Sequence, residues 1–201
     1  CALTIATLFG IPLGVFTGSG DTGIFRTWVS AISSVLLALP TLFLVLALMV
    51  VLARFGWLPP PGVRALSILP PALALALPAM ALIERTHSHA IRRTLREPYI
   101  LGALARGVPV GTIVWKHAMR VALNTTLGTF VLAAGSLLSG SFVVELIADW
   151  PGLAALTSDA LRARDPFLLA GCVGAAGGVL ATVVLFADIL HLWVDPRLQQ
   201  T

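Results

Sequence analysis

Residues 96–120 read REPYILGALARGVPVGTIVWKHAMR, and this charged stretch stands out in a chain that is otherwise strongly apolar. Hydrophobic residues make up 58% of the 201 residues and charged residues 11%, and the mean hydropathy is +0.96. Ordinary soluble domains carry about 25% charged residues. The composition therefore predicts a membrane protein, with the stretch around Arg106 in a loop between apolar segments.

Charge-free runs on both sides of this stretch locate the expected membrane crossings. A helix needs about 20 predominantly apolar residues to cross the hydrocarbon core. We expect an all-α fold, a polytopic transmembrane helical bundle with about five spans, at Cys1–Gly20, Thr27–Ala53, Ala65–Ile83, Val121–Val144 and Pro166–Ala187. Prolines within or near the starts of these spans predict kinks, at Pro40, Pro70, Pro71 and Pro78.

The first expected span begins without an initiator Met or a basic flank. A secretory signal peptide has a basic start and a small-residue cleavage site, and neither is evident here. We expect residues 1–201 to be one N-terminally incomplete transmembrane domain that lacks at least one upstream span. Cys1 and Cys172 both lie in apolar runs, which favours a packing role over a disulfide.

The distribution of lysine and arginine between the loops predicts the orientation, because cytoplasmic loops carry the excess. With five alternating crossings, one side receives four of these residues, Arg54, Arg64, Arg162 and Arg164. The other side receives nine, which are Arg26, Arg85, Arg92, Arg93, Arg96, Arg106, Lys116, Arg120 and Arg197. This places residues 91–120 and the C-terminus in the cytoplasm and residues 145–167 outside. Nucleic-acid binding is not expected, because no interleaving of aromatic and basic residues and no soluble fold surround the basic cluster.

The cytoplasmic loop contains the signals of a short helix. Pro98 suits the first helical position, and Glu97 before it complements the positive end of the helix. Gly107 can adopt the left-handed conformation that ends a helix, and Pro109 opposes a restart. These signals predict a helix over about Pro98–Arg106.

A helix of this length needs a surface to pack on, since isolated helices shorter than about 12 to 15 residues are marginal in water. Its expected apolar stripe consists of Ile100, Leu101, Leu104 and Ala105, with Gly102 and Ala103 allowing close approach. The helix could dock on a protein partner. It could equally lie on lipid headgroups, held by Arg92, Arg93, Arg96 and Arg106.

Several segments of the chain resemble a known family. They are ALARG at residues 103–107, HAMR at 117–120, GSFVVELIADWPGLAALTSDALRARD at 140–165 and DPR at 195–197. FGWLPPPG at 55–62 and LPPALALALPAMALIER at 69–85 agree more loosely. Together they resemble the inner-membrane permease subunits of ATP-binding-cassette importers, in the dipeptide, oligopeptide and nickel branch. The resemblance covers nearly the whole chain.

The resemblance implies that the loop helix, part of the family's EAA motif, sits in a groove of a cytoplasmic ATPase. The family's acidic position falls on Leu101 and its first alanine on Gly102, which departs from the usual pattern. The residues expected to couple to the ATPase are Glu97, Tyr99, Leu101, Ala103, Leu104, Arg106, Gly107 and His117. ATP and Mg²⁺ are then bound by the ATPase, and this chain carries no cofactor or metal.

The outer loop is implied to lie near the translocation mouth, where a soluble binding protein docks. Its matching residues are Glu145, Trp150, Pro151, Gly152, Asp159 and Asp165. Structural roles are expected for Pro151 and Gly152, and Trp150 also suits a membrane interface. Ser158–Arg164 is expected to form a short helix along the bilayer surface.

The implied function is that of the membrane-spanning permease of an ATP-driven importer for peptides or related small solutes. The implied partners are a second homologous permease, two ATPase subunits and an external binding protein, all at a bacterial or archaeal inner membrane. The chain has no nucleotide-binding loop of its own, because its only lysine, Lys116, lies between Trp115 and His117. No catalytic residues and no enzymatic activity are expected.

A proton-coupled secondary transporter is the alternative. Asp188, His191 and Asp195 share one helix face and could relay protons, although a structural polar face is favoured. His87 and His89 are two residues apart, which places them on different sides of a helix and argues against a metal site. A close helix interface is predicted at Gly171, Gly174, Gly177 and Gly178.

Overall fold

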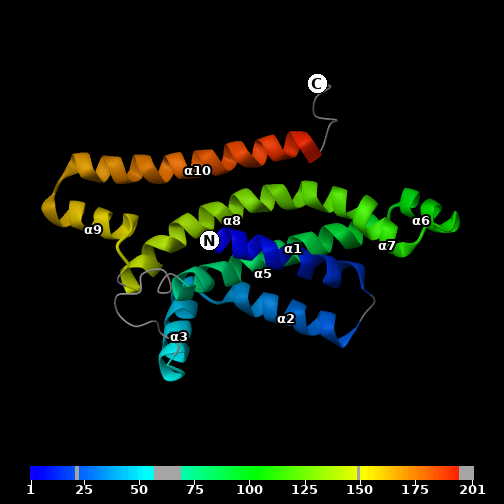
Figure 1. Ribbon diagram of the computed structural model, residues 1–201, viewed down its shortest axis with the longest axis horizontal. Helices are drawn as coiled ribbons and strands as arrows, with labels where there is room; N and C mark the ends of the chain where they lie inside the picture. Colours follow the sequence, from blue (N-terminus) through cyan, green and yellow to red (C-terminus); the bar gives the residue numbers. More distant parts are fainter. Residues whose placement is uncertain (21–22, 57–68, 149, 195–201) are drawn as a thin grey trace.

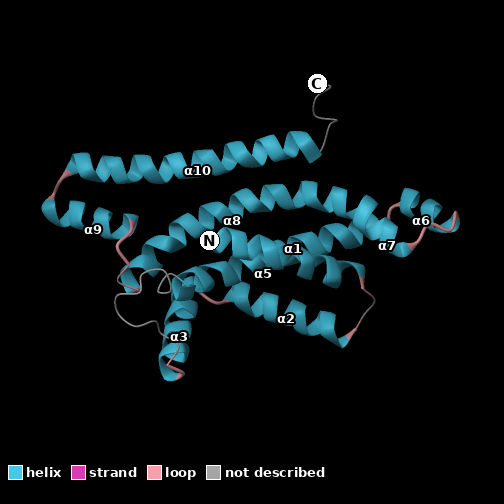
Figure 2. Ribbon diagram, viewed as in Figure 1, coloured by secondary structure: helices cyan, strands magenta, loops and turns pink. Residues whose placement is uncertain are grey.

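A computed structural model describes residues 1–20, 23–56, 69–148 and 150–194 of the chain. Its described residues form helices and connecting turns without strands (Figure 2). The first helices are α1 (Ala2–Ser19), α2 (Ile24–Ala38), α3 (Thr41–Arg54) and α5 (Leu69–Leu95). The remaining ones are α6 (Pro98–Ala105), α7 (Val110–Thr112), the π-helical turn η1 (Ile113–Ala118), α8 (Met119–Ile147), α9 (Leu153–Ala163) and α10 (Pro166–Val194).

The long helices lie side by side in an elongated bundle (Figure 1). The helix α5 occupies the centre and packs against α1 and α8, while α10 packs against α8 and α9. The short helix α6 lies at one end of the bundle, and α9 lies at the opposite end. The two loops that the sequence places on opposite sides of a membrane are therefore at opposite ends of the molecule.

The length and composition of the helices bear out a multi-pass membrane protein. Among the described residues, three stretches are long and apolar enough to span a bilayer: Ala2–Ser19, Val110–Ile147 and Pro166–Trp193. The bent pair formed by α2 and α3 raises the number to four. The apolar half of α5 is followed by Glu84 and Arg85, and this helix falls outside that set. The expected number of five spans is thus approximate.

The second expected span is broken in two. The helix α2 ends at Ala38, Leu39 is extended with φ −82° and ψ 131°, and α3 starts after Pro40 at an angle of 109° to α2. A residue before proline disfavours the helical region, which explains the break. The third expected span begins at Ala65, in residues outside the described part, and α5 runs on from Leu69 through Pro78 to Leu95.

Helices α1 and α5 pack closely against each other, because glycines repeat along the face of α1 that contacts α5. A Cβ atom on Gly10, Gly14 or Gly18 would lie within about 3 Å of α5 atoms, including the carbonyl oxygens of Met80 and Glu84. Such spacing lets helix backbones approach closely in lipid. This interface was not predicted from the sequence.

The predicted close interface of α10 is wrong within this chain. A Cβ atom added at any of its four glycines meets nothing within 4 Å, at Gly171, Gly174, Gly177 and Gly178. Large apolar side chains of α10 are exposed, such as Phe167 at 86% and Trp193 at 83%. Cys172, by contrast, is buried as expected for a packing residue, whereas Cys1 is exposed.

A buried carboxylate ties α1 and α2 to α5. Glu84 is 3% exposed, and its two carboxylate oxygens accept hydrogen bonds from the hydroxyls of Thr17 at 2.5 Å and Ser33 at 2.8 Å. Two turns further along α5, Arg92 donates to the carbonyl oxygen of Thr17 and to the hydroxyl of Ser88, both at 3.0 Å. Because buried polar groups need partners, these bonds select the register of α1 against α5.

Candidate functional site

The short helix α6 forms as the sequence predicts, ending one residue earlier than expected. Glu97 is its N-cap and Pro98 its first residue, and Arg106 is the C-cap. Gly107 has φ +79°, and its N–H donates to the carbonyl oxygen of Leu104 at 2.9 Å. The N–H of Val108 donates to the carbonyl oxygen of Ala103 at 3.2 Å, which completes the helix end.

The inner face of α6 differs from the predicted stripe. Ile100 is fully buried and Ala103 is 7% exposed, and both pack with Ile113 of η1 in a cluster that Leu95 of α5 and Val108 border. Leu101, Leu104 and Ala105, the other residues of the predicted stripe, are exposed. The apolar residues of α6 surround the helix, so their spacing alone did not identify the packed side.

The outer face of α6 is apolar and open. Tyr99, Leu101 and Leu104 are exposed to 51%, 56% and 40%. Arg106 is exposed beside them at the C-terminal end. Of the expected coupling residues, Ala103 therefore lies on the inner face, and the others named here lie on a surface that a partner can reach.

The turn η1 connects this helix to the long helix α8. Its π-helical residues, Ile113–Ala118, follow α7 without a break and lead directly into Met119. Single π-helical turns within α-helices occur frequently at functional sites. His117, an expected coupling residue, is exposed on this turn, while Ile113 and Val114 are buried.

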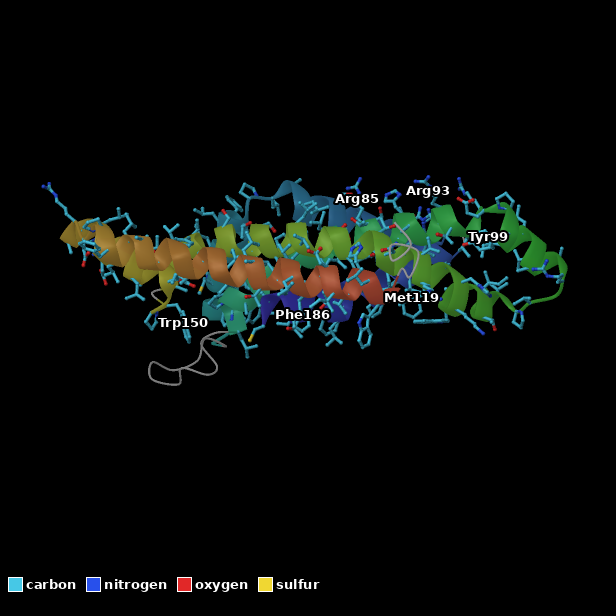
Figure 3. The ribbon with its side chains drawn as sticks, turned by 90° about the horizontal axis from the view of Figure 1, so that it is seen from above. Arg85, Arg93, Tyr99, Met119, Trp150 and Phe186 are labelled. Atoms are coloured by element: carbon cyan, nitrogen blue, oxygen red, sulfur yellow. The ribbon has the colours of Figure 1, made fainter. Side chains whose placement is uncertain are left out.

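A basic cavity of about 1040 Å³ lies between α5, the start of α6 and the start of α8. Three arginines line it, Arg85 and Arg93 from α5 and Arg120 from α8. Figure 3 shows Arg85 and Arg93 projecting from the same edge of the molecule, with Tyr99 of α6 beyond Arg93. In the sequence these arginines indicate topology, and their spacing does not reveal that they surround one cavity.

The outer loop is organised by Glu145. Its carboxylate accepts a hydrogen bond of 2.8 Å from the N–H of Ala154, in the first turn of α9. Gly152, the N-cap of α9, has no side chain that could accept this hydrogen bond. A Cβ atom at Gly152 would collide with the carboxyl group of Glu145. The N–H of Trp150 donates to the carbonyl oxygen of Glu145 at 2.9 Å. The structural role expected for Gly152 is confirmed.

The loop then turns tightly into α10. Arg164 ends α9 in the left-handed conformation with φ 54°, and Asp165 accepts hydrogen bonds from the N–H groups of Phe167 and Leu168 at 2.9 and 3.1 Å. Asp165 is therefore the N-cap of α10, with Pro166 at the first helical position. Asp159 and Pro151 are exposed. The helix α9 starts at Leu153, five residues before the expected Ser158.

The two histidines of α5 lie in different surroundings. His87 is fully buried, with its Nδ1 atom 2.7 Å from the hydroxyl oxygen of Thr126, while His89 is exposed on the far side of α5. The two imidazoles thus lie on different sides of the helix, as predicted. Asp188 is exposed on α10 and His191 is partly buried, and Asp195 lies outside the described residues.

This architecture, an apolar bundle with a helix docked at one end and a short helix across the other, is that of a multi-pass helical membrane protein. Residues 10–200 match the family described as "Binding-protein-dependent transport system inner membrane component". The chain belongs to this family.

Similar proteins with curated descriptions are permeases. The chain is 34% identical, over 97% of its length and 66% of the relative, to the "Oligopeptide transport system permease protein AppB" of Bacillus subtilis. It is 29% identical, over 99% of its length and 66% of the relative, to the "Glutathione transport system permease protein GsiC" of Pectobacterium atrosepticum. The "Dipeptide transport system permease protein DppB" of Haemophilus influenzae is 35% identical over 66% of the chain and 40% of that relative. The chain thus spans no more than 66% of these relatives.

A solved structure shares the fold. The chain described as "Inward facing conformations of the MetNI methionine ABC transporter" aligns with a TM-score of 0.70 and 16% identity, over 96% of this chain and 89% of that one. At this identity the likeness bears on the fold alone. It agrees with the expected all-α bundle of the importer permease type.

Proposed function

We propose that the chain is the membrane-spanning permease subunit of an ATP-driven importer for peptides or related small solutes. Family membership and the names of the relatives support this function. The proposal places the protein in a bacterial or archaeal inner membrane, with residues 91–120 and the C-terminus in the cytoplasm. The excess of nine basic residues over four supports that orientation.

The observation that carries the proposal is the open apolar face of α6. Tyr99, Leu101 and Leu104 are exposed on a helix that the chain itself stabilises from beneath. Exposed aromatic and aliphatic side chains on a docked helix are typical of a protein interface. We assign this face to a cytoplasmic ATPase subunit that binds ATP and Mg²⁺ and supplies the energy.

The packing under α6 provides a path for mechanical coupling. Ile100 and Ile113 are buried together and bordered by Leu95, so the inner face of α6 contacts both the end of α5 and the turn η1, which leads directly into α8. A displacement of α6 then moves both long helices, because tightly packed interiors transmit strain. In the proposed cycle, ATP binding moves α6, and α5 and α8 alternate between inward and outward access.

The proposed assembly has two permeases, two ATPases and an external solute-binding protein. The binding protein is assigned to residues 145–167, where Asp159 is exposed on α9 and Glu145 and Gly152 hold that helix in place. This chain contributes the pathway and its coupling, and the partner hydrolyses ATP.

Co-purification tests the proposal. The full-length permease is purified in mild detergent with its importer partners, either unchanged or with Leu101→Ser and Leu104→Ser. The matched control is Leu161→Ser, which removes a leucine that is 61% exposed on α9, at the other end of the bundle. We expect the ATPase to be lost with the α6 variant and retained with the control.

The result that overturns the proposal is equal ATPase recovery from all three forms, or none from any. Solute uptake in vesicles then tests the alternative function, a proton-coupled secondary transporter. Uptake that continues without ATPase and collapses with the proton gradient would establish the secondary transporter, with Asp188 and His191 as its candidates.

A further inference from the structure

The basic cavity concentrates positive charge along one wall. Arg85, His89 and Arg93 follow each other at four-residue spacing on α5 and all line the cavity. Residues four apart share a helix face, so these basic side chains extend over about 12 Å of the helix at about 1.5 Å per residue. Arg120 and Asn124, also four apart, form the facing wall on α8.

The charge is not balanced by the residues of the lining. Arg85, Arg93 and Arg120 contribute +3 and Glu97 contributes −1, which leaves +2 with His89 neutral. A second, adjoining hollow of about 470 Å³ is lined by Arg92, Arg93, Arg96, Glu97 and His89. Clefts lined by one sign of charge raise the local concentration of the opposite sign. The cavity is therefore suited to an anion.

The remaining lining favours an organic anion over a small inorganic ion. Thr86, Thr125 and Asn124 offer hydroxyl and amide groups, and Leu82 and Val121 offer apolar surface. Small-molecule sites usually enclose about 300–1000 Å³ and combine apolar walls with a few polar groups. The volume of about 1040 Å³ lies at the upper end of that range. Guanidinium groups bind carboxylates in a matching, two-pronged geometry.

We propose that this cavity binds the free carboxylate of the transported peptide, with Arg85 and Arg93 as its principal partners. The inference rests on the proposed import of peptides and goes beyond it by naming the group that is recognised and the side chains that recognise it. The α-carboxylate is common to unmodified peptides of different sequence, so a site for it selects a class of solute and tolerates varied side chains. The cavity reaches Glu97 and Tyr99 at the start of α6, which places bound solute next to the helix assigned to coupling.

The test compares one peptide as the free acid and as the C-terminal amide. The complete importer, with its ATPase and binding protein, is reconstituted in liposomes, and initial uptake rates of alanine tripeptide and its amide are measured below saturation. Arg93→Gln and Arg85→Gln are compared with the unchanged protein and with Arg26→Gln. Arg26 lies on α2, on the same expected side of the membrane and outside the cavity lining. The binding protein is the same in all samples, so its own preference for the free acid or the amide cancels when the uptake ratios of the permease variants are compared.

We expect the ratio of free-acid to amide uptake to fall by about tenfold in Arg93→Gln and Arg85→Gln, the effect of losing a charge-assisted hydrogen bond. The ratio should be unchanged in Arg26→Gln, and Arg93→Lys should retain part of it. Retained co-purification of the ATPase shows that the variants are assembled.

An unchanged ratio in both cavity variants, with normal peptide uptake, overturns the carboxylate site and leaves the importer function standing. Failure of the unchanged protein to import either peptide refutes peptide transport itself and removes the peptide as occupant. A phosphate-bearing lipid is tested by native mass spectrometry in phosphatidylglycerol. If Arg93→Gln lowers the amount of bound lipid without changing the uptake ratio, the cavity holds a lipid headgroup and the proposal is wrong.

Discussion

The carboxylate of Glu145, at the end of α8, takes the place of the capping side chain that Gly152 lacks at the start of α9. It accepts the N–H of Ala154 at 2.8 Å, and Gly152 leaves room for it. The two residues are seven positions apart, and one hydrogen bond and one absent Cβ join the end of α8 to the start of the outer helix. This pairing makes the orientation of α9 dependent on α8.

Replacing Glu145 by alanine should loosen the first turn of α9. Loss of an N-terminal cap costs about 1 kcal/mol, which corresponds to about fivefold faster amide exchange. Hydrogen exchange measured on the peptide that covers the start of α9 checks this. Asp159→Ala, which removes an exposed carboxylate from the same helix, is the control and should leave the exchange unchanged. Equal exchange in Glu145→Ala and the unchanged protein would contradict the capping role.

Gly107→Ala should weaken the end of α6 through backbone conformation alone. A Cβ at Gly107 meets nothing within 4 Å, but φ is +79°, where an L-residue costs about 1–2 kcal/mol. Gly111→Ala is a matched control, since it also meets nothing within 4 Å and lies in α7 without a positive φ. We expect uptake per ATP hydrolysed to fall severalfold in Gly107→Ala and to be maintained in Gly111→Ala. Normal coupling in Gly107→Ala, and in a bulkier Gly107→Val, would count against a coupling role.

Structural features that depend on neighbouring residues can be predicted from the sequence more accurately than those that depend on distant residues. The ends of α6 were predicted because Glu97, Pro98 and Gly107 act on their own backbone. The face of α6 that packs within the chain was not predicted, since a helix of eight residues carries apolar side chains all round and the burial of Ile100 is decided by Ile113. A helix end is a local property, whereas a packed face depends on its neighbours.

Features formed by residues far apart in the sequence were harder to predict. Small residues repeat in both α1 and α10, and only the tertiary structure shows that a Cβ added at Gly14 would collide with α5 while one added at Gly174 would meet nothing within 4 Å. The basic cavity joins Arg85 and Arg93 to Arg120 through the turn of the chain at α6. Counting basic residues by loop predicts on which side of the membrane they lie and could not identify the shared cavity.

Gly14→Ala should destabilise the bundle by overpacking. The new Cβ would lie 2.8 Å from Cβ of His87 and 2.9 Å from the carbonyl oxygen of Glu84, and that backbone atom cannot move without displacing α5. Overpacking a tight contact costs about 1–3 kcal/mol, and each kcal/mol lowers the melting temperature by about 2–4 °C in a protein of this size. Thermal unfolding of the detergent-solubilised importer measures the shift. Gly174→Ala, placed in open space, should change the melting temperature by less, and equal shifts for the two variants would refute the proposed α1–α5 contact.

Removal of the Glu84 carboxylate should detach α2 from the bundle. Ser33 is the residue of α2 that is buried in the described structure, and its hydroxyl donates to Glu84 at 2.8 Å. Thr17 retains the carbonyl oxygen of Leu13 as an acceptor at 2.9 Å, so the loss falls mainly on Ser33. A buried hydroxyl without a partner costs about 1–3 kcal/mol.

We therefore expect faster hydrogen exchange across α2 in Glu84→Ala, by about fivefold to a hundredfold for that cost. Glu84→Gln, whose amide oxygen can still accept a hydroxyl, should show a smaller increase. Ser30→Ala serves as the control, because Ser30 lies on α2 and is exposed. If Glu84→Ala and Ser30→Ala exchange alike, the carboxylate does not hold α2, and its burial against Thr17 must serve the α1–α5 contact alone.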